Sequence, residues 1–75
     1  MDKHTLNAFI AVAETKSFSS AAEILHVTQS TISKRIALLE TTMGQKLFDR
    51  IARQVSVTPA GAELLPRAKH MVQEY

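Results

Sequence analysis

Cysteine is missing from this 75-residue chain, and glycine and proline occur only twice each. The lack of cysteine excludes a disulfide framework and a thiolate metal site, and it is compatible with a reducing compartment. The scarcity of glycine and proline argues against a disordered or low-complexity segment. No apolar run approaches the roughly 18 residues that a membrane span needs. Polar residues interrupt residues 1–19, so we expect no secretory signal peptide there.

Catalytic and cofactor-binding patterns are missing too. The histidines His4, His26 and His70 are too scattered in the sequence to predict a metal site. The serines have no histidine and acid at the spacing of a catalytic triad. No glycine-rich loop is present to hold a nucleotide. We therefore predict a protein that is not an enzyme and that needs neither a metal nor another cofactor.

The composition fits one small globular domain with an uneven distribution of charge. Hydrophobic residues make up 45% of the chain, and the formal net charge is +2. Residues 28–57 contain five basic and two acidic side chains, whereas the remainder contains four basic and five acidic ones. A locally basic segment is typical of nucleic-acid binding, although an ordinary solvated surface accounts equally well for so small an asymmetry.

Two short amphipathic helices are predicted in the first third of the chain. Residues 3–15 place apolar side chains at helical spacing at Leu6, Phe9, Ile10 and Ala13. A second helix begins at Ser17, or at Ser20 if Ser20 and Glu23 form a capping box. Its inner face consists of Phe18, Ala21, Ala22 and Leu25. The small alanines allow a neighbouring helix to approach closely.

A third helix follows after a tight connection and presents two different faces. Thr28 is its predicted cap, and Gly44 is the residue that ends it after about Met43. One face carries branched aliphatic side chains, at Ile32, Ile36 and Leu39. The opposite face is small, polar and cationic, at Ser30, Ser33, Lys34 and Ala37. Such a helix, the second of a helix-turn-helix, is suited to the DNA major groove.

The pattern then changes from helical to extended. Residues 47–50 and 55–57 are predicted strands, and residues 51–54 link them without an Asn-Gly turn signal. A basic hairpin directly after a helix-turn-helix is a wing. Thr58 and Pro59 then predict the start of another helix, in which Pro66 should produce a kink.

An apolar stripe runs along this last predicted helix. It consists of Leu64, Leu65, Ala68, Met71, Val72 and Tyr75. We expect nothing else in the chain to cover it, so that two copies pair through residues 58–75. The stripe is still running at Tyr75 without a C-cap, which leads us to expect a truncated chain.

Taken together, these motifs resemble the amino-terminal DNA-binding domain of LysR-type transcriptional regulators. The matching residues are Ser17-Phe18, Ala21-Ala22-Glu23, Leu25, Val27, Gln29, Ile32-Ser33, Ile36, Leu39-Glu40, Gly44, Leu47-Phe48, Arg50 and Thr58-Pro59-Ala60-Gly61. The resemblance implies a mostly α fold, with a winged helix-turn-helix at 1–57 (a three-helix core plus a β-hairpin wing) and a long linker and dimerisation helix at 58–75. It also implies an effector-binding domain, which the 75 residues do not contain.

Three positions depart from the family pattern. Ser30 stands where the family often has proline, and Lys34 and Arg35 stand where arginine followed by a polar residue is common. Val57 replaces the usual leucine before the Thr-Pro pair. None of these changes disturbs the implied fold, but those at 30, 34 and 35 touch the DNA face.

Candidate DNA contacts on the third helix follow from the residue types and from the resemblance. Gln29 is predicted to bond adenine, or else to act as a solvated or capping residue. Ser30 and Ser33 either bond bases or give clearance in the groove. Lys34 contacts a guanine or, preferably, a phosphate. The stem of Arg35 packs against the helix flank, and its charged head meets a backbone phosphate or an acid. Thr28 and Thr31 are helix-start residues, phosphate ligands or both.

Candidate contacts on the wing are Arg50, Arg53 and Gln54. Arg50 contacts a phosphate or pairs with Asp49 or Glu40. Arg53, at the predicted wing tip, is the candidate probe of the minor groove, and the alternative is a mobile loop arginine. Gln54 lies in the same predicted link.

The preferred functional hypothesis is therefore sequence-specific binding of double-stranded DNA by a symmetric dimer on an inverted repeat. Its expected location is the bacterial cytoplasm, at the nucleoid and not in a membrane. The resemblance allows a higher oligomer in the intact regulator, and it implies that a small-molecule effector acts only through the missing domain. The alternative is a protein-interaction module whose working surface is helix 58–75.

Overall fold

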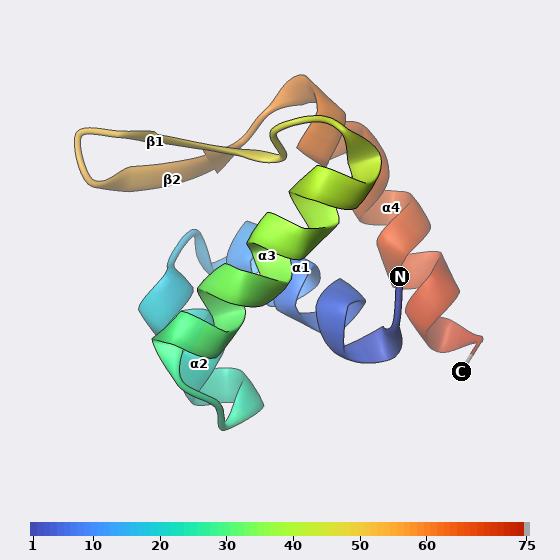
Figure 1. The fold of residues 1–75 in the computed structure, drawn as a ribbon, viewed down its shortest axis with the longest axis horizontal. Coiled ribbons are helices and arrows are strands. Elements are labelled where there is room, and N and C mark those ends of the chain that lie inside the picture. Colours follow the sequence, from blue (N-terminus) through green and yellow to red (C-terminus); the bar gives the residue numbers. More distant parts are fainter. Residues whose placement is uncertain (75) are drawn as a thin grey trace.

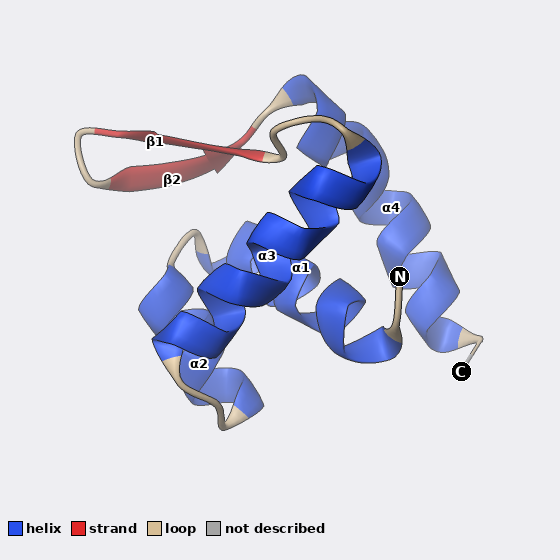
Figure 2. Cartoon of the chain, viewed as in Figure 1, coloured by secondary structure: helices blue, strands red, loops and turns tan. Residues whose placement is uncertain are grey.

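The computed structural model describes residues 1–74, which form four helices and one two-stranded antiparallel hairpin (Figure 2). In chain order these are α1 (Lys3–Thr15), α2 (Phe18–Leu25), α3 (Gln29–Met43), β1 (Phe48–Ile51), β2 (Gln54–Val57) and α4 (Pro59–Gln73). The predicted architecture of a helical core, a hairpin wing and a long final helix is confirmed. Among the described residues, no helix is both long enough and apolar enough to cross a bilayer.

Local capping chemistry determines where the first two helices begin and end. The Asp2 carboxylate accepts a hydrogen bond from the Thr5 amide at 2.8 Å, and this bond lowers the pKa of Asp2. At the other end of α1, Lys16 adopts a left-handed conformation with φ of 58°. Ser17 then caps α2 by accepting from the Ser20 amide at 3.0 Å. Of the two predicted starts for α2, the structure therefore has the one at Ser17.

The predicted limits of α3 are confirmed at both ends. His26, with φ of 58°, turns the chain between α2 and α3. Thr28 then caps α3 by accepting from the Thr31 amide at 3.2 Å. Gly44 ends the helix with φ of 69°, a left-handed conformation in which glycine carries no steric penalty.

The hydrophobic core is centred on α1, which packs against all three other helices (Figure 1). The apolar face predicted for α3 is buried, with Ile32, Ile36 and Leu39 between 0 and 3% exposed. Leu47, predicted as the first strand residue, instead lies before β1 and is fully buried. Its role is therefore to anchor the wing in the core. The largest fully buried side chains are Phe9, Leu6, Ile32, Leu39, Leu47 and Val12.

The hairpin has a tighter turn than the sequence indicated. Ile51 pairs with Gln54, so the link contains two residues and not the predicted four. Both turn residues, Ala52 and Arg53, have positive φ, at 52° and 66°. This conformation at both central residues is typical of the type I′ turn, whose twist matches that of the strands it joins. The hairpin projects from the helical body (Figure 1).

Part of the apolar stripe on α4 is covered within the chain, which corrects the expectation that it has no cover. Leu64 and Ala68 are 6% and 0% exposed, because α1 packs against α4. Leu65, Met71 and Val72 are only partly buried, and Tyr75 lies outside the described residues. The helix continues through Pro66 and ends at Gln73, where Glu74 is the C-cap that the sequence did not predict.

Candidate nucleic-acid interface

The outward face of α3 has the small, polar and cationic character that the sequence predicted. Gln29, Ser30, Lys34 and Ala37 are exposed and Ser33 is half-buried, on the side opposite the buried aliphatic residues. No acidic side chain occurs on α3 before Glu40. This surface can therefore approach a polyanion without electrostatic repulsion.

Three hydroxyl groups lie together where α3 begins. The Thr28 hydroxyl lies 2.9 Å from that of Thr31 and 3.1 Å from that of Ser30. It also accepts the Thr31 amide, so the predicted helix-start role of Thr28 is confirmed. The remaining first-turn amides of a helix have no partner within it and favour anions. A phosphate contact by these threonines stays a prediction.

Arg50 on β1 lies over an aromatic ring instead of pairing with an acid. Its guanidinium carbon is 4.0 Å from the centre of the Phe18 ring. The ion pairs among residues 1–74 do not involve Arg50, so neither Asp49 nor Glu40 is its partner. Glu40 has other partners, because its carboxylate accepts from the amides of Leu47 at 2.8 Å and Phe48 at 3.4 Å.

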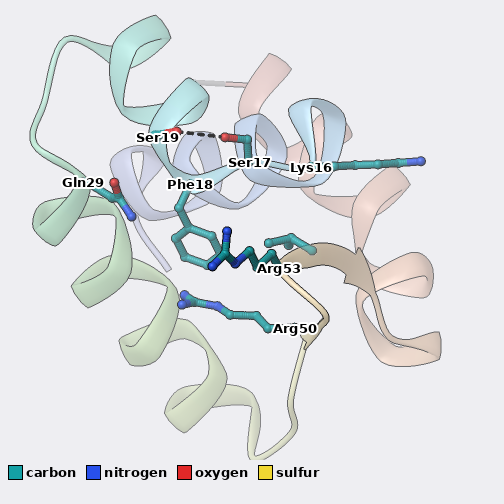
Figure 3. Close-up of a pocket in the computed structure, with 8 residues that line it drawn as sticks. Lys16, Ser17, Phe18, Ser19, Gln29, Arg50 and Arg53 are labelled. Atoms are coloured by element: carbon teal, nitrogen blue, oxygen red, sulfur yellow. Dashed lines mark hydrogen bonds between the residues drawn. The ribbon is translucent and has the colours of Figure 1, made fainter.

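A cleft of about 300 Å³ separates the wing from the starts of α2 and α3. Figure 3 shows the side chains of Arg50 and Arg53 directed from the wing into this space, with Gln29 facing it from α3. Lys16 lies at the rim, and its side chain extends away from the two arginines. Also at the edge are Ser17 and Ser19, whose hydroxyls are 3.1 Å apart, together with Phe18 and Val55.

The structure thus brings three predicted contacts together and adds residues that sequence reasoning missed. Gln29, Arg50 and Arg53 line one cleft, although they come from separate elements. Lys16 and Ser19 were missed because neither lies on the predicted recognition helix or wing. The available signal in the sequence was the position of Lys16, a cation directly before the predicted cap Ser17.

The other predicted site residues lie outside this cleft. Ser33 lines a second hollow, of about 510 Å³, between α3 and β1, which Glu40 and Asp49 also line. Arg35 is half-buried, and the ion pairs of residues 1–74 do not include it. Gln54 is exposed and begins β2, opposite Ile51.

Known proteins resemble this chain in both sequence and fold. Residues 4–62 match the family model described as "Bacterial regulatory helix-turn-helix protein, lysR family". An uncharacterized HTH-type transcriptional regulator from the ibpB-leuC intergenic region of Azotobacter vinelandii is 62% identical over 68 residues. That alignment covers 91% of this chain and 47% of the relative, so the chain spans about half of that protein's length.

Solved structures give the same result. The CbnR DBD–DNA complex contains a chain with 36% identity and a TM-score of 0.92, and the match covers 97% of this chain and 84% of that one. The BenM DBD complex with catB site 1 DNA gives 34% identity and a TM-score of 0.92, covering 99% and 83%. Sequence, wing and helix-turn-helix therefore agree: the chain belongs to the lysR family of bacterial regulatory helix-turn-helix proteins.

Proposed function

We propose that this chain binds double-stranded DNA in a sequence-specific way, as the DNA-binding domain of a LysR-type transcriptional regulator. The observation that carries the proposal is the outer face of α3, which has no acid before Glu40. It lies next to a cleft with two arginines that have no acidic partner among residues 1–74. The similar CbnR and BenM structures support it, because both are complexes with DNA.

In this proposal α3 occupies the major groove and reads bases from its first turns. Gln29 is exposed at the first position of α3, where its amide can bond an adenine edge in two places. Ser30 and Ser33 are small enough to let the helix enter deeply. Lys34 is exposed on the same side and contacts a backbone phosphate, which positions the helix without reading sequence.

The wing lies over the neighbouring minor groove. Arg53, in the turn of the hairpin, is the proposed minor-groove probe, since a narrow A/T-rich groove concentrates negative potential. Arg50 contributes positive charge at the cleft, where a backbone phosphate is the matching ligand. Thr28 and Thr31 offer their hydroxyls to a phosphate at the start of α3, where first-turn amides of a helix favour anions.

Two copies bind together through the exposed part of α4, on DNA with inverted half-sites. Leu65, Met71 and Val72 remain only partly buried in the monomer and form the proposed dimer surface, with Tyr75 as a further candidate. The chain acts at the nucleoid in the bacterial cytoplasm. In an intact regulator, higher oligomers and a response to a small molecule would depend on a further domain.

Selection of bound duplexes from random DNA tests the proposal. We expect enrichment of one sequence with two-fold symmetry. Binding to the enriched duplex should resist an excess of random competitor and weaken steeply with salt. A protein-interaction module, the competing function, would show neither a preferred sequence nor a steep salt dependence. Equal affinity for the enriched and random duplexes would overturn the proposal.

A further inference from the structure

The base of the wing is fixed in the core, but the rest of it touches the helical body sparingly. Phe48, the first residue of β1, is 6% exposed and packs against Phe9, with the ring centres 5.4 Å apart. Beyond Phe48 the hairpin projects outward (Figure 1). An isolated two-stranded hairpin is marginally stable and flexible. The position of its tip therefore depends on whatever contact holds the projecting part.

Arg50 supplies such a contact two residues further along β1. Alternation along a strand places Phe48 and Arg50 on the same face of the hairpin, where Val57 and Val55 are their cross-strand partners. Asp49 and Ile51 face the other way, and Ile51 is 72% exposed. The face with Phe48 and Arg50 is thus the one directed at the helices.

Both of these wing residues, Phe48 and Arg50, contact the ring of Phe18. Its ring lies edge-on to Phe48, with the centres 6.1 Å apart and an interplanar angle of 70°. The guanidinium of Arg50 lies 4.0 Å from the centre of the same ring. Phe18 itself is 6% exposed and is the first residue of α2, directly after the Ser17 cap. One rigidly held ring therefore orients both the base and the projecting part of the wing.

We propose that Arg50 is a positioning residue, which fixes the wing relative to α3 through its stack on Phe18. The proposal rests on the function proposed above. It identifies the contact that determines where the wing holds Arg53 relative to the DNA. A planar guanidinium matches the face of an aromatic ring, and because Arg50 is exposed the attraction is that of a solvent-accessible pair. Because no acid competes for Arg50 among residues 1–74, the ring is its partner in the free protein.

The alternative is that Arg50 acts through its phosphate contact alone, without positioning the wing, and Arg50→Lys separates the two cases. Lysine keeps the charge but lacks the planar group that stacks. If Arg50 only neutralises a phosphate, the lysine variant should bind the enriched duplex as the original does. If the stack positions the wing, binding should weaken about two- to five-fold, the worth of one cation–π contact. Affinity unchanged by Arg50→Lys would overturn the proposal.

A first measurement needs no DNA. Protons of the Arg50 side chain above the Phe18 ring should show upfield NMR shifts, which disappear in Phe18→Leu. Circular dichroism and thermal unfolding check that this variant, which alters a buried ring, stays folded. Ordinary shifts at Arg50 in the unaltered protein would contradict the stack, whatever the DNA experiments give.

The decisive measurement is a double-mutant cycle on the enriched duplex with A/T-rich flanks. If the stack positions the wing, the affinity lost through Arg53→Ala should be smaller, by at least about two-fold, in the Phe18→Leu or Arg50→Lys background than in the original protein. Lys34→Ala, on α3, is the matched control and should lose the same affinity in every background. The Arg50→Lys cycle leaves the core intact, so it decides the matter even if Phe18→Leu unfolds.

Two outcomes would contradict the two proposals separately. Full additivity of the affinity losses with Arg53→Ala would overturn the positioning role while leaving DNA binding established. Loss of all sequence preference would overturn the proposed function instead.

Discussion

Gly61 in α4 lies so close to Leu47 that a Cβ at position 61 would overlap the carbonyl oxygen of Leu47. The same carbonyl accepts the Thr58 amide at 3.0 Å, and the Thr58 hydroxyl donates to the carbonyl of Lys46 at 2.7 Å. Thr58 also accepts from the Gly61 amide, so one residue caps α4 and ties it to the segment before β1. The start of α4 and the base of the wing are therefore joined through backbone contact.

Gly61→Ala tests this junction, because the substitution either raises or lowers the free energy of unfolding. In an ordinary helix interior, replacing glycine by alanine stabilises by about 1 kcal/mol. Here we expect the free energy of unfolding to fall by about 1–3 kcal/mol, because the new methyl overlaps backbone that cannot move freely. Urea denaturation measures the change. A more stable Gly61→Ala protein would mean that the junction relaxes easily.

Gly44→Ala is the companion variant, because it tests the cost of a positive φ for a non-glycine residue in the absence of a steric overlap. A Cβ at Gly44 would meet no atom of the described residues within 4 Å apart from its own chain neighbours, but φ is +69°. We expect a loss of about 1–2 kcal/mol from the left-handed backbone alone.

Glu40→Ala should loosen the connection between α3 and the wing. The Glu40 carboxylate accepts from the amides of Leu47 and Phe48, and its side chain is 17% exposed. Leaving these amides unpaired should lower the free energy of unfolding by about 1–3 kcal/mol. Hydrogen exchange should accelerate at the amides of Leu47 and Phe48. Glu40→Gln keeps an acceptor and should retain most of their protection; equal exchange in both variants would show that water replaces the carboxylate.

Ala52→Asn should stabilise the wing without adding a tertiary contact. Ala52 has φ of 52°, where a non-glycine side chain is strained and asparagine is tolerated better. We expect the free energy of unfolding to rise by about 0.5–1 kcal/mol, comparable to other backbone-matching substitutions. Thermal unfolding gives the result, and Ser56→Asn, at an exposed position of β2, is the control that should bring no gain. A loss of stability would indicate that Ala52 is not held in this conformation in solution.

Features that depend on neighbours along the chain could be predicted from the sequence, and those that join distant segments could not. The caps Ser17, Thr28 and Thr58 and the terminator Gly44 act on backbone within a few residues, so their residue types suffice. The turn was missed because Ala52 and Arg53 have no intrinsic preference for positive φ. It is pairing of the flanking strands that imposes that conformation.

The apolar stripe and the Phe18–Arg50 stack are two features that join distant segments and that the sequence therefore did not predict in full. Helical periodicity predicted which face of α4 is apolar, but not that α1 covers Leu64 and Ala68. Likewise, the sequence identified Phe18 as a core residue and Arg50 as a DNA contact separately. Only the fold brings the ring and the guanidinium within 4.0 Å of each other.

Base reading and phosphate binding should separate in two single variants of α3. Gln29→Ala should relax the preference at one base pair per half-site and cost about 1–3 kcal/mol on the enriched duplex only. Lys34→Ala should weaken binding to all duplexes alike and lower the salt slope by about one per monomer. Lys69→Ala, whose side chain pairs with Glu14 at 2.9 Å, is the matched cation control and should change neither. Equal losses on specific and random DNA for Gln29→Ala would remove it from the base-reading residues.

The last prediction concerns assembly through α4. Leu64 and Ala68 lie in the monomer core, which leaves Leu65, Met71 and Val72 as the described members of the α4 stripe that a second copy can contact. Each fully buried side chain of this kind contributes about 1.5–3 kcal/mol, against a large entropic cost of association. We therefore expect a weak two-fold dimer that tightens when DNA engages both half-sites at once.

Replacing Leu65 and Val72 together by glutamate tests this surface, because like charges would then face each other across the dimer. The variant should be monomeric in sedimentation at several concentrations, keep its helix content, and bind a paired site no better than a single half-site. Arg67→Glu, at an exposed position of α4, produces the same change in net charge and should leave the dimer intact. A dimer that persists in the double variant would mean that association uses another surface. Since Leu65 and Val72 are only partly buried in the monomer, loss of the dimer with retained helix content would then identify α4 as the contact between the two copies.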